Sequence, residues 1–414
     1  MVFFYKIGVY IYYFGILITS LCNTKAKEWL KGRRNFFTNL KQDIDPNAFP
    51  IWIHCASLGE FEQGRPVIES LKKQYPRRKI IITFFSSSGY KIQKNYEYAD
   101  WITYLPLDTK RNAKQFISTI NPSFAIFIKY EFWYNYLKEL YDNKIPVFLV
   151  SAIFRKNQIN SIIPGKWYRK VLHLFSYIFV QDNISKQLLN DCELKQVTIS
   201  GDTRFDRVQQ ISAETGENKK IEKFKDNAQL FIGGSTWPRD EQIIAKFINI
   251  SEHSGLKYII APHEISETHI DSLTRSINKK VVRYSAANLY NIQQYNVLII
   301  DNIGMLASLY KYGDLAYIGG GFGQGIHNIL EPATFGLPIL FGPNYHKFRE
   351  AHQLIGRGGA FAFSNFEEFK QKMIYLLYSH ENLSHAGEIS QSFVKKRRGA
   401  TDTILQFLND SVLV

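Results

Sequence analysis

Short apolar runs alternate with helix-like stretches along nearly all of the chain after residue 45. In the first half, runs of strand length cover residues 51–56, 80–85, 124–128, 147–153, 177–181 and 197–200. In the second half they cover residues 230–233, 258–261, 281–284, 297–300, 315–318, 338–341 and 359–363. Apolar strands separated by helices are typical of a parallel sheet covered on both faces. The pattern predicts an α/β protein with two Rossmann-like domains.

A polar stretch separates the two series of strands. Residues 209–228 lose apolar content and gain charge, which predicts a linker that contains a short helix. We therefore expect an N-terminal domain over 23–208, a C-terminal domain over 229–395, and a C-terminal helix over 396–414, for which a return to the N-terminal domain is one alternative. Ligands of parallel sheets bind beyond the carboxyl ends of the strands, so two facing domains predict a site in the cleft between them.

The N-terminal segment is apolar. Residues 2–21 are interrupted only by Lys6, and about 20 apolar residues can span a bilayer as a helix. A basic cluster follows, which the positive-inside rule places on the cytoplasmic side against anionic lipid: Lys25, Lys27, Lys31, Arg33, Arg34 and Lys41. Residues 1–22 are predicted to be a membrane anchor helix. It either spans the bilayer, lies in its interface or packs on the protein itself.

Charge and cysteine usage narrow the classes of partner. A net charge of +14 suits nucleic acid, an anionic membrane surface or an anionic substrate. We expect no nucleic acid partner, because no zinc finger, RNP motif or helix-turn-helix signature is present. The three cysteines, Cys22, Cys55 and Cys192, lack pairing or metal-ligand spacing, so a reducing compartment and no bound metal or cofactor are expected.

A glycine-rich segment follows the apolar run 315–318. Glycines such as Gly320, Gly321 and Gly325 let backbone approach a ligand closely, and a helix N-terminus attracts phosphate. We expect this turn to open a helix whose first turn carries three polar side chains: His327, Asn328 and Glu331. Glu331 could bind sugar hydroxyls. The arrangement suits a nucleotide-activated sugar.

Two further motifs follow strands of the second half. Ser235 and Thr236, in a Gly-Gly-Ser-Thr turn before a helix, have the layout of a phosphate cradle, although GK[ST] of a Walker motif is absent. Pro262 and His263 end the next strand, where a contact to the base or ribose competes with an ordinary surface turn.

Carboxylates and hydroxyls follow strands of the first half. Glu60, preceded by Ser57 and Gly59, could take a proton from an acceptor hydroxyl, or it is a helix-start acid stabilised by the helix dipole. Glu131 could orient a sugar or tune Glu60, or it pairs with Lys129 or an arginine.

Two more candidates carry similar alternatives. Ser87 lies in a loop that suits phosphate or carboxylate binding, but Ser87 or Ser88 could instead cap a helix. Arg204 could reach an anionic group, or it forms a salt bridge with Asp202 or Asp206.

Taken in order along nearly the whole chain, these motifs resemble the 3-deoxy-D-manno-octulosonic acid (Kdo) transferases of lipid A biosynthesis, glycosyltransferase family 30. The Ser-x-Gly-Glu of Ser57–Glu60 and the Gly-rich segment Gly319–Glu331 are the most specific matches. Looser matches are Lys129–Asn135, Gly201–Asp206 and Ser235–Glu241.

The resemblance implies a GT-B fold and an inverting, metal-independent transfer of Kdo from CMP-Kdo to lipid IVA in lipopolysaccharide biosynthesis. It implies Glu60 as the base, Glu131 as a second essential acid, and Arg204 in the place of a lysine. His327, Asn328 and Glu331 match the CMP-binding turn. It also implies attachment to the inner (cytoplasmic) membrane, with the catalytic domains on its cytoplasmic face.

Departures from the family pattern bear on acceptor recognition and CMP binding. Lys129 replaces a glutamate, Tyr134 replaces a proline, Arg155 is displaced by two positions, and Pro262-His263-Glu264 stands for Pro-Arg-His. The alternatives are another GT-B enzyme that acts on a UDP-sugar, such as an epimerase, and an inactive lipid- or sugar-binding homologue.

Overall fold

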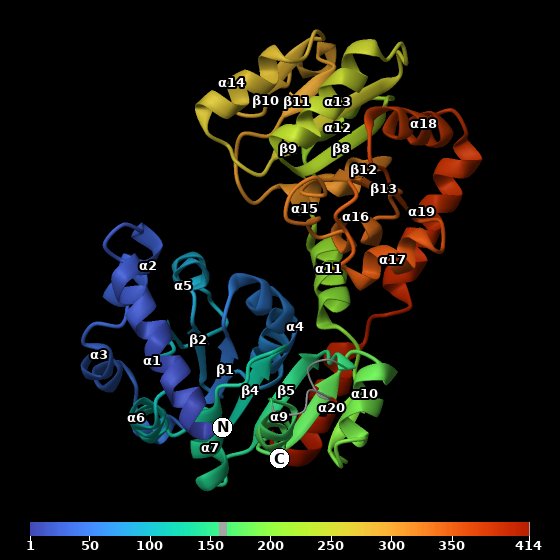
Figure 1. Ribbon diagram of the computed structural model, residues 1–414. Coiled ribbons are helices and arrows are strands. Elements are labelled where there is room, and N and C mark those ends of the chain that lie inside the picture. The colour runs from blue at the N-terminus through green and yellow to red at the C-terminus, as the bar shows by residue number, and fades with distance from the viewer. Residues whose placement is uncertain (157–163, 414) are drawn as a thin grey trace. The chain divides into compact units, whose positions relative to one another are not determined.

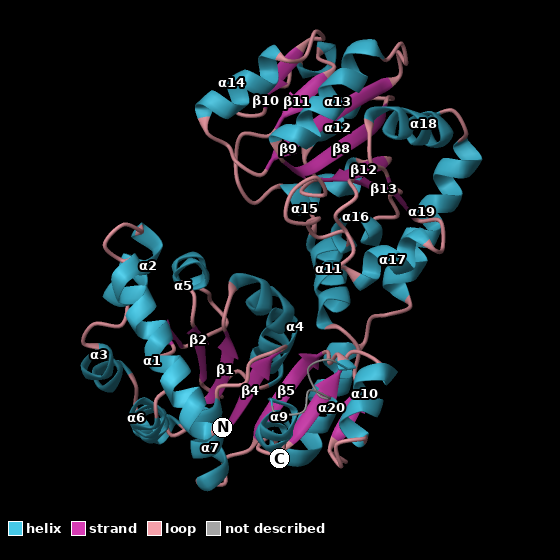
Figure 2. Ribbon diagram, in the orientation of Figure 1, coloured by secondary structure: helices cyan, strands magenta, loops and turns pink. Residues whose placement is uncertain are grey.

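The computed structural model describes residues 1–156 and 164–413, which form two compact units. Unit 1 comprises Met1–Arg207 and the chain from Arg398 onward, and unit 2 comprises Val208–Arg397. Each unit is a parallel sheet flanked by helices (Figures 1 and 2).

The sheet of unit 1 has seven parallel strands in the order β3-β2-β1-β4-β5-β6-β7. Their bounds are β1 (Ile51–Cys55), β2 (Ile80–Phe84), β3 (Trp101–Tyr104), β4 (Phe124–Ile128), β5 (Val147–Ala152), β6 (Tyr177–Val180) and β7 (Val197–Ile199). Strand β3 was not expected from the sequence. It lies at the sheet edge and is only partly buried, so its apolar signal is weak.

Alternating residues of these strands build a core on each face of the sheet. Trp52 and Phe127 pack on one face, and Ile51 and Ile53 on the other. The helices of unit 1 are α1 (Val2–Thr19), α2 (Thr24–Lys31), α3 (Phe36–Asp43), α4 (Leu58–Gln74), α5 (Ser87–Gln93), α6 (Lys110–Ile120), α7 (Tyr134–Asp142), α9 (Pro164–Leu172), α10 (Asn183–Asn190) and α20 (Ala400–Leu408).

The C-terminal helix α20 packs on unit 1. Its Ile404, Leu405 and Leu408 belong to the same core as Phe61 of α4. At its start, the Asp206 carboxylate accepts hydrogen bonds from the backbone of Gly399 (2.6 Å) and Thr401 (2.7 Å), and from the Thr401 hydroxyl (2.7 Å). These bonds satisfy N–H groups that the helix leaves open at its N-terminus.

Unit 2 also has seven parallel strands, in the order β10-β11-β9-β8-β12-β13-β14. Their bounds are β8 (Gln229–Thr236), β9 (Leu256–Pro262), β10 (Val281–Arg283), β11 (Val297–Ile299), β12 (Leu315–Ile318), β13 (Ile339–Phe341) and β14 (Ala360–Ala362). The helices that lie wholly in this unit are α12 (Lys219–Lys225), α13 (Pro238–Ile250), α14 (Glu267–Arg275), α15 (Leu306–Leu309), α16 (Leu330–Thr334), α17 (Arg349–Ile355), α18 (Phe366–Leu377) and α19 (His380–Lys395).

The stretch 209–228 is largely helical. It contains the end of α11 (Thr203–Glu214) and all of α12. Ile221 and Phe224 of α12 are fully buried, so two apolar residues anchor a helix that is otherwise charged. The low apolar content that suggested a linker belongs in part to α12, a helix that buries apolar side chains on one face only.

Helix α1 lies along unit 1 and buries none of its residues. The Tyr5 hydroxyl donates to the buried carboxylate of Asp108, and the Tyr12 ring contacts Trp29 and Phe85. Its other side exposes a strip of large apolar side chains: Phe3, Phe4, Ile7, Ile11, Phe14 and Ile18. Among the described helices, α1 is the one long and apolar enough to cross a bilayer, which is weak evidence by itself.

Candidate functional site

Strand order places two carboxylates at the same point of unit 1. Neighbouring strands β1 and β4 are where the order of the sheet reverses, and open α/β sheets bind ligands beyond the carboxyl ends of the strands at this point. Glu60 lies shortly after β1 and Glu131 shortly after β4. The chain therefore brings both sequence-predicted acids to the position where this fold binds ligands.

Glu60 is held at the start of α4 by Ser57. The Ser57 backbone N–H donates to Glu60 Oε2 (2.9 Å), as does the Ser57 hydroxyl (3.0 Å), and the Glu60 N–H contacts Ser57 Oγ (3.4 Å). This is a capping box, so the helix-start role of Glu60 is real. Gly59 is in the first turn of α4, and a side-chain carbon there would meet nothing within 4 Å. Open space therefore lies next to Gly59.

The pKa of Glu60 is unusual for a helix-start acid. Burial, followed by the negative charge of Glu131, raises it to about 7, against the opposing effects of the Ser57 hydrogen bonds and Lys129. A helix N-terminus ordinarily favours the ionised form. A carboxylate with a pKa near neutrality is suited to accept a proton in a reaction at physiological pH.

Glu131 is fixed by aromatic and imidazole neighbours. The Trp133 indole N–H donates to Glu131 Oε2, and His54 Nε2 lies 3.5 Å from the same oxygen, which is long for a hydrogen bond. His54 is fully buried, whereas the Glu131 side chain is 12% exposed. Glu131 thus keeps contact with solvent from an otherwise aromatic wall.

A chain of donors behind Glu131 defines the state of His54. The Trp52 indole N–H donates to Thr83 Oγ1 (2.8 Å), and the same oxygen lies 2.8 Å from His54 Nδ1. An indole N–H can only donate, so Thr83 Oγ1 accepts from Trp52 and its own proton is available to His54 Nδ1. His54 Nδ1 then acts as an acceptor, and the ring proton of the neutral imidazole lies on Nε2, facing Glu131. Sequence reasoning gave His54 no role. Its spacing from Trp52 puts both on one face of β1, which is the signal that could have suggested one.

The other two predicted residues of unit 1 are Ser87, which is the first residue of α5, and Arg204. The N-cap of α5 is Ser86, whose hydroxyl accepts from the Gly89 N–H (3.2 Å), so the expected cap at Ser87 or Ser88 was one or two residues too late. Arg204 forms an ion pair with Asp202 (2.7 Å). Burial opposes ionisation of Asp202, but Arg204 outweighs it and holds the pKa of that carboxyl below its usual value.

The sheet of unit 2 also reverses its strand order at one point. Strands β8 and β12 are neighbours at the point where its order reverses, and the glycine-rich loop 319–329 follows β12. Ser235 and Thr236 are the last two residues of β8, at an irregularity in its pairing with β9, and not a turn after a strand that ends at Gly233. Ser235 adopts a left-handed backbone conformation (φ 51°). Thr236 is buried and its hydroxyl donates to Glu241 Oε1 (2.9 Å), so it supports the end of β8 from inside. Pro262 is the last residue of β9.

The glycine-rich loop differs from the expectation of a helix starting within it. Helix α16 begins only at Leu330 and has five residues, so His327 and Asn328 precede it and only Glu331 lies in its first turn. The N–H groups of Gly323 and Gly325 donate to the Gly320 carbonyl, and that of His327 to the Gly319 carbonyl. These internal bonds curl the loop into consecutive turns and delay the helix.

Buried Asp240 holds this loop to the start of α13. Its carboxylate accepts from the backbone N–H of Gly320 (2.9 Å) and of Trp237 (2.9 Å), and from the Tyr317 hydroxyl (2.6 Å). The glycine-rich loop and the segment that follows Ser235 and Thr236 are therefore connected through one buried acid.

Four glycines of the loop are required by close packing. A side-chain carbon on Gly319 would lie 2.1 Å from the Ser235 carbonyl oxygen. A side-chain carbon on Gly320 (φ 89°) would lie 2.4 Å from the Gly325 carbonyl oxygen, and one on Gly321 would lie 2.6 Å from the Gly342 nitrogen. On Gly325 (φ 134°) it would lie 2.9 Å from the Phe348 ring. These contacts shape the loop before any ligand binds.

An aromatic stack stands beside the loop. The rings of Trp237 and His263 are 4.5 Å apart at 23°, and those of His263 and His327 are 4.7 Å apart at 28°. The Trp237 indole N–H donates to His327 Nε2 (3.1 Å). Burial, then His263, lowers the pKa of His327, which agrees with a neutral ring that accepts this bond. Nearby, the Asn328 amide donates to Glu331 Oε1 (3.0 Å).

Comparison with known proteins gives the site a context. Residues 28–207 match the model of a protein family described as 3-deoxy-D-manno-octulosonic-acid transferase (kdotransferase). The chain is a homologue of the Kdo transferases. The 3-deoxy-D-manno-octulosonic acid transferase of Rickettsia felis is 27% identical over 94% of this chain and 88% of its own. The transferase of Aquifex aeolicus is 26% identical over 84% of this chain and 92% of its own. The transferase of Haemophilus influenzae is 24% identical over 94% of this chain and 93% of its own.

Solved structures agree on the fold. The UDP-GlcNAc 2-epimerase of Neisseria meningitidis has a TM-score of 0.63 at 15% identity, covering 87% of this chain and 100% of its own. A glycosyltransferase of Rickettsia africae has a TM-score of 0.55 at 12% identity, covering 87% and 98%. At such identities the likeness shows the fold alone. The expected α/β class of GT-B type, with an apolar N-terminal helix, is confirmed.

Proposed function

We propose that this Kdo transferase homologue moves Kdo from CMP-Kdo to a hydroxyl group of lipid IVA, with inversion at the anomeric carbon and without a metal ion. The observation that carries the proposal is the pair of acids at the switch point of unit 1, in which Glu60 has a pKa of about 7. The Kdo transferase homology over most of the chain supports the identity of the transferred sugar.

In the proposed reaction, Glu60 takes the proton of the acceptor hydroxyl while that oxygen attacks the anomeric carbon of Kdo. The bond from this carbon to the phosphate oxygen breaks, and CMP leaves with the bonding electrons. The negative charge of Glu131 contributes to the raised pKa of Glu60. The Trp133 indole N–H holds Glu131 in this position, with His54 Nε2 3.5 Å from the same oxygen.

Unit 2 is proposed to bind CMP-Kdo. Glu331 is suited to the ribose hydroxyls, with Asn328 holding its carboxylate. The exposed Trp237 ring and the His263 ring offer flat faces to the cytosine. Ser235 at the end of β8 and the loop at Gly320 and beyond are proposed to surround the phosphate. We propose that Arg204, still charged in its pair with Asp202, faces the Kdo carboxylate.

Helix α1 is proposed to attach the protein to the cytoplasmic face of the inner membrane by lying in the interface. Tyr5 and Tyr12 bind it to unit 1 along one side, which a helix crossing the bilayer could not maintain. The exposed apolar strip on its other side suits the acyl boundary, and the basic residues that follow suit anionic headgroups.

The decisive experiment incubates purified full-length protein with CMP-Kdo and lipid IVA and counts Kdo residues on the product. Glu60→Ala is expected to lower kcat by roughly 10²- to 10⁴-fold, the contribution of a general base, with CMP affinity unchanged. Glu62→Ala, on the same helix but in ion pairs with Arg65 and Arg207, is the control and should remain active.

Two results would contradict the proposal. Near-normal turnover of Glu60→Ala would remove Glu60 from the base role. Competition by UDP but not by CMP, together with no Kdo transfer, would favour an enzyme that acts on UDP-sugars.

A further inference from the structure

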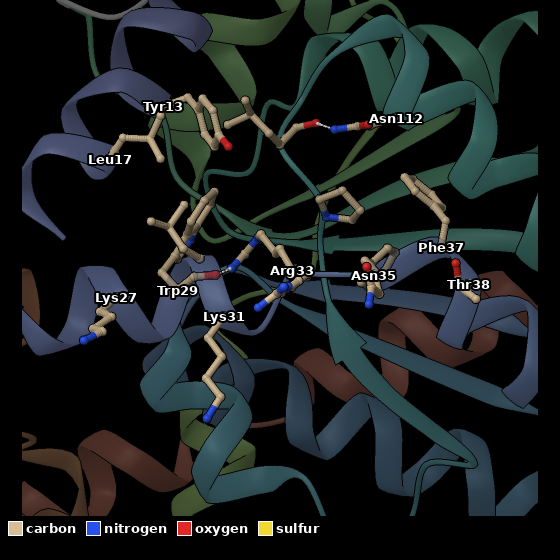
Figure 3. A pocket seen from close by; sticks show the side chains of 15 residues that line it. Tyr13, Leu17, Lys27, Trp29, Lys31, Arg33, Asn35, Phe37, Thr38 and Asn112 are labelled. Atoms are coloured by element: carbon tan, nitrogen blue, oxygen red, sulfur yellow. Dashed lines mark hydrogen bonds between the residues drawn. The ribbon is translucent and has the colours of Figure 1, made fainter. Parts of the chain in front are cut away.

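A pocket of about 910 Å³ lies in unit 1 among α1, the segment α2–α3 and the loop after β3 (Figure 3). Its volume is in the range of small-molecule sites and exceeds what a single inorganic ion needs. Four cations line it, Lys27, Lys31, Arg33 and Arg34, and no Asp or Glu is among the described residues that do. The pocket therefore has one sign of charge.

Arg33 is the deepest of these cations. Its guanidinium lies 3.8 Å from the centre of the Trp29 ring and 4.9 Å from that of Phe85. Its N–H groups donate to the carbonyls of Leu105 (3.0 Å), Trp29 (3.2 Å) and Phe85 (2.8 Å). A guanidinium has five N–H groups, so two remain for another acceptor.

The charge of Arg33 has no carboxylate partner among the residues that the structure describes. Burial lowers its pKa to about 9, and the groups that oppose this shift are the phenols of Tyr104, Tyr136 and Tyr12. Phenols are neutral at pH 7, whereas Arg33 remains a cation. A bound anion would supply the missing counter-charge, and a phosphate suits the planar fork of a guanidinium.

Apart from Asn35, Thr38 and Asn112, the remaining residues that line the pocket are apolar or aromatic. Tyr13 and Leu17 come from α1 and Phe37 from α3. Figure 3 shows Leu17 and Tyr13 above the Arg33 side chain, while Lys27 and Lys31 extend outward. A ligand of this pocket is thus an amphiphile, with an anionic group at Arg33 and an apolar part along α1.

A series of ring contacts connects Arg33 of the pocket to Glu131. The centre of the Phe85 ring lies 5.4 Å from that of Trp29 and 4.6 Å from that of Trp133. The Trp133 indole N–H donates to the Glu131 carboxylate. Two aromatic rings, Phe85 and Trp133, therefore lie between the Arg33 guanidinium and Glu131. A lipid anchored there would have its head group near the proposed catalytic edge.

We propose that the Arg33 pocket binds a phosphate group of the acylated acceptor, with Arg33 and Arg34 as its cations and an acyl chain along α1. The identity of the acceptor rests on the proposed function, but the anion site does not. Lys31 and Lys27 add long-range attraction at the rim.

The test measures binding of full-length protein to lipid IVA in detergent micelles and to the same lipid after enzymatic removal of its phosphates. Lys31→Gln/Arg34→Gln removes two exposed pocket cations. Lys25→Gln/Lys41→Gln removes two exposed cations of the same segment that do not line the pocket. Lys31 and Lys41 each occupy the last turn of a helix, so these two substitutions should have a similar effect on helix stability.

The pocket pair is expected to weaken binding of phosphorylated lipid IVA by about tenfold or more, the loss expected for a charge-assisted hydrogen bond. The control pair should stay within about twofold of the wild type, since screened surface charges act weakly. The dephosphorylated lipid should bind the wild type and the pocket pair equally weakly. In the transfer assay, KM for the lipid should rise while KM for CMP-Kdo stays constant.

Other outcomes would overturn the inference. Equal loss in the two pairs would mean general electrostatics, and equal affinity for the two lipids would mean that phosphate is not recognised. A parallel assay measures binding to phosphatidylglycerol vesicles. If the pocket pair weakens binding to these vesicles but not to lipid IVA, the pocket binds a membrane phospholipid. A failure of the proposed function would give a different result. The wild type would transfer no Kdo, but its binding to phosphorylated lipid IVA would still be weakened by the pocket pair of substitutions.

Discussion

At the scale of single residues, the environment of Glu60 determines what its position can do. The same carboxylate closes a capping box with Ser57 and lies beside a second acid, Glu131. A helix start alone would favour ionisation, but burial and like charge outweigh it and raise the pKa to about 7. Other titratable groups that these acids influence are Cys55 and Tyr5, while Lys129 opposes the shift.

Glu131→Gln is expected to move the acidic limb of the pH profile of kcat/KM downward from about 7, by roughly one unit. The sign follows from the charges: a base works when ionised, and removing a neighbouring negative charge makes Glu60 ionise at lower pH. Burial of Glu60 persists, so its pKa should stay above 4.5. The profile is measured from pH 5 to 9. If the midpoint of its acidic limb stays at the same pH or moves to a higher pH, the two acids are not electrostatically coupled.

At the scale of elements, the glycine-rich loop is shaped by packing as much as by any ligand. Gly321 lies directly against the backbone of Gly342 after β13, whereas Gly323 has its nearest neighbour atom, the Gly320 carbonyl oxygen, at 3.7 Å. The loop's turns consume N–H groups within it, and Asp240 anchors it to α13. Glycine content alone does not distinguish these requirements.

Gly321→Ala is expected to destabilise unit 2 by about 1–3 kcal/mol, because the new methyl group overlaps backbone that cannot move aside cheaply. Gly323→Ala is the matched control in the same loop and should be nearly neutral. Thermal unfolding and CMP affinity of both variants provide the measurement. If the two alanines cost the same stability, close packing does not explain the glycine at 321.

At the scale of the whole molecule, each unit is a separate parallel sheet, and chain segments distant in sequence complete unit 1. Helix α20 returns to it after unit 2 and is held at its start by Asp206. Helix α1 is attached by Tyr5 and Tyr12 at one side only. Its opposite side is available for a membrane.

Replacing Phe3, Phe4 and Ile11 by serine should release the protein from membranes and leave its melting temperature unchanged, because these side chains are exposed. Deleting residues 1–22 should also release it, but with a lower melting temperature, since buried Asp108 loses the Tyr5 hydroxyl. Flotation with anionic vesicles and thermal unfolding test both. If the truncated protein still floats, the basic surface is the anchor.

The order of apolar runs and the residues that follow them were readable from the chain, because strand and helix periodicities and helix-start signals are local properties. Most strands, the α/β class and the positions of Glu60, Glu131 and the glycine-rich loop came from that pattern. Strand order was not local: only the assembled sheet makes β4 the neighbour of β1 and so brings Glu131 to Glu60. Burial determines the raised pKa of Glu60, the position of His54 behind Glu131 and the lowered pKa of Arg33, and burial depends on segments that are distant in sequence.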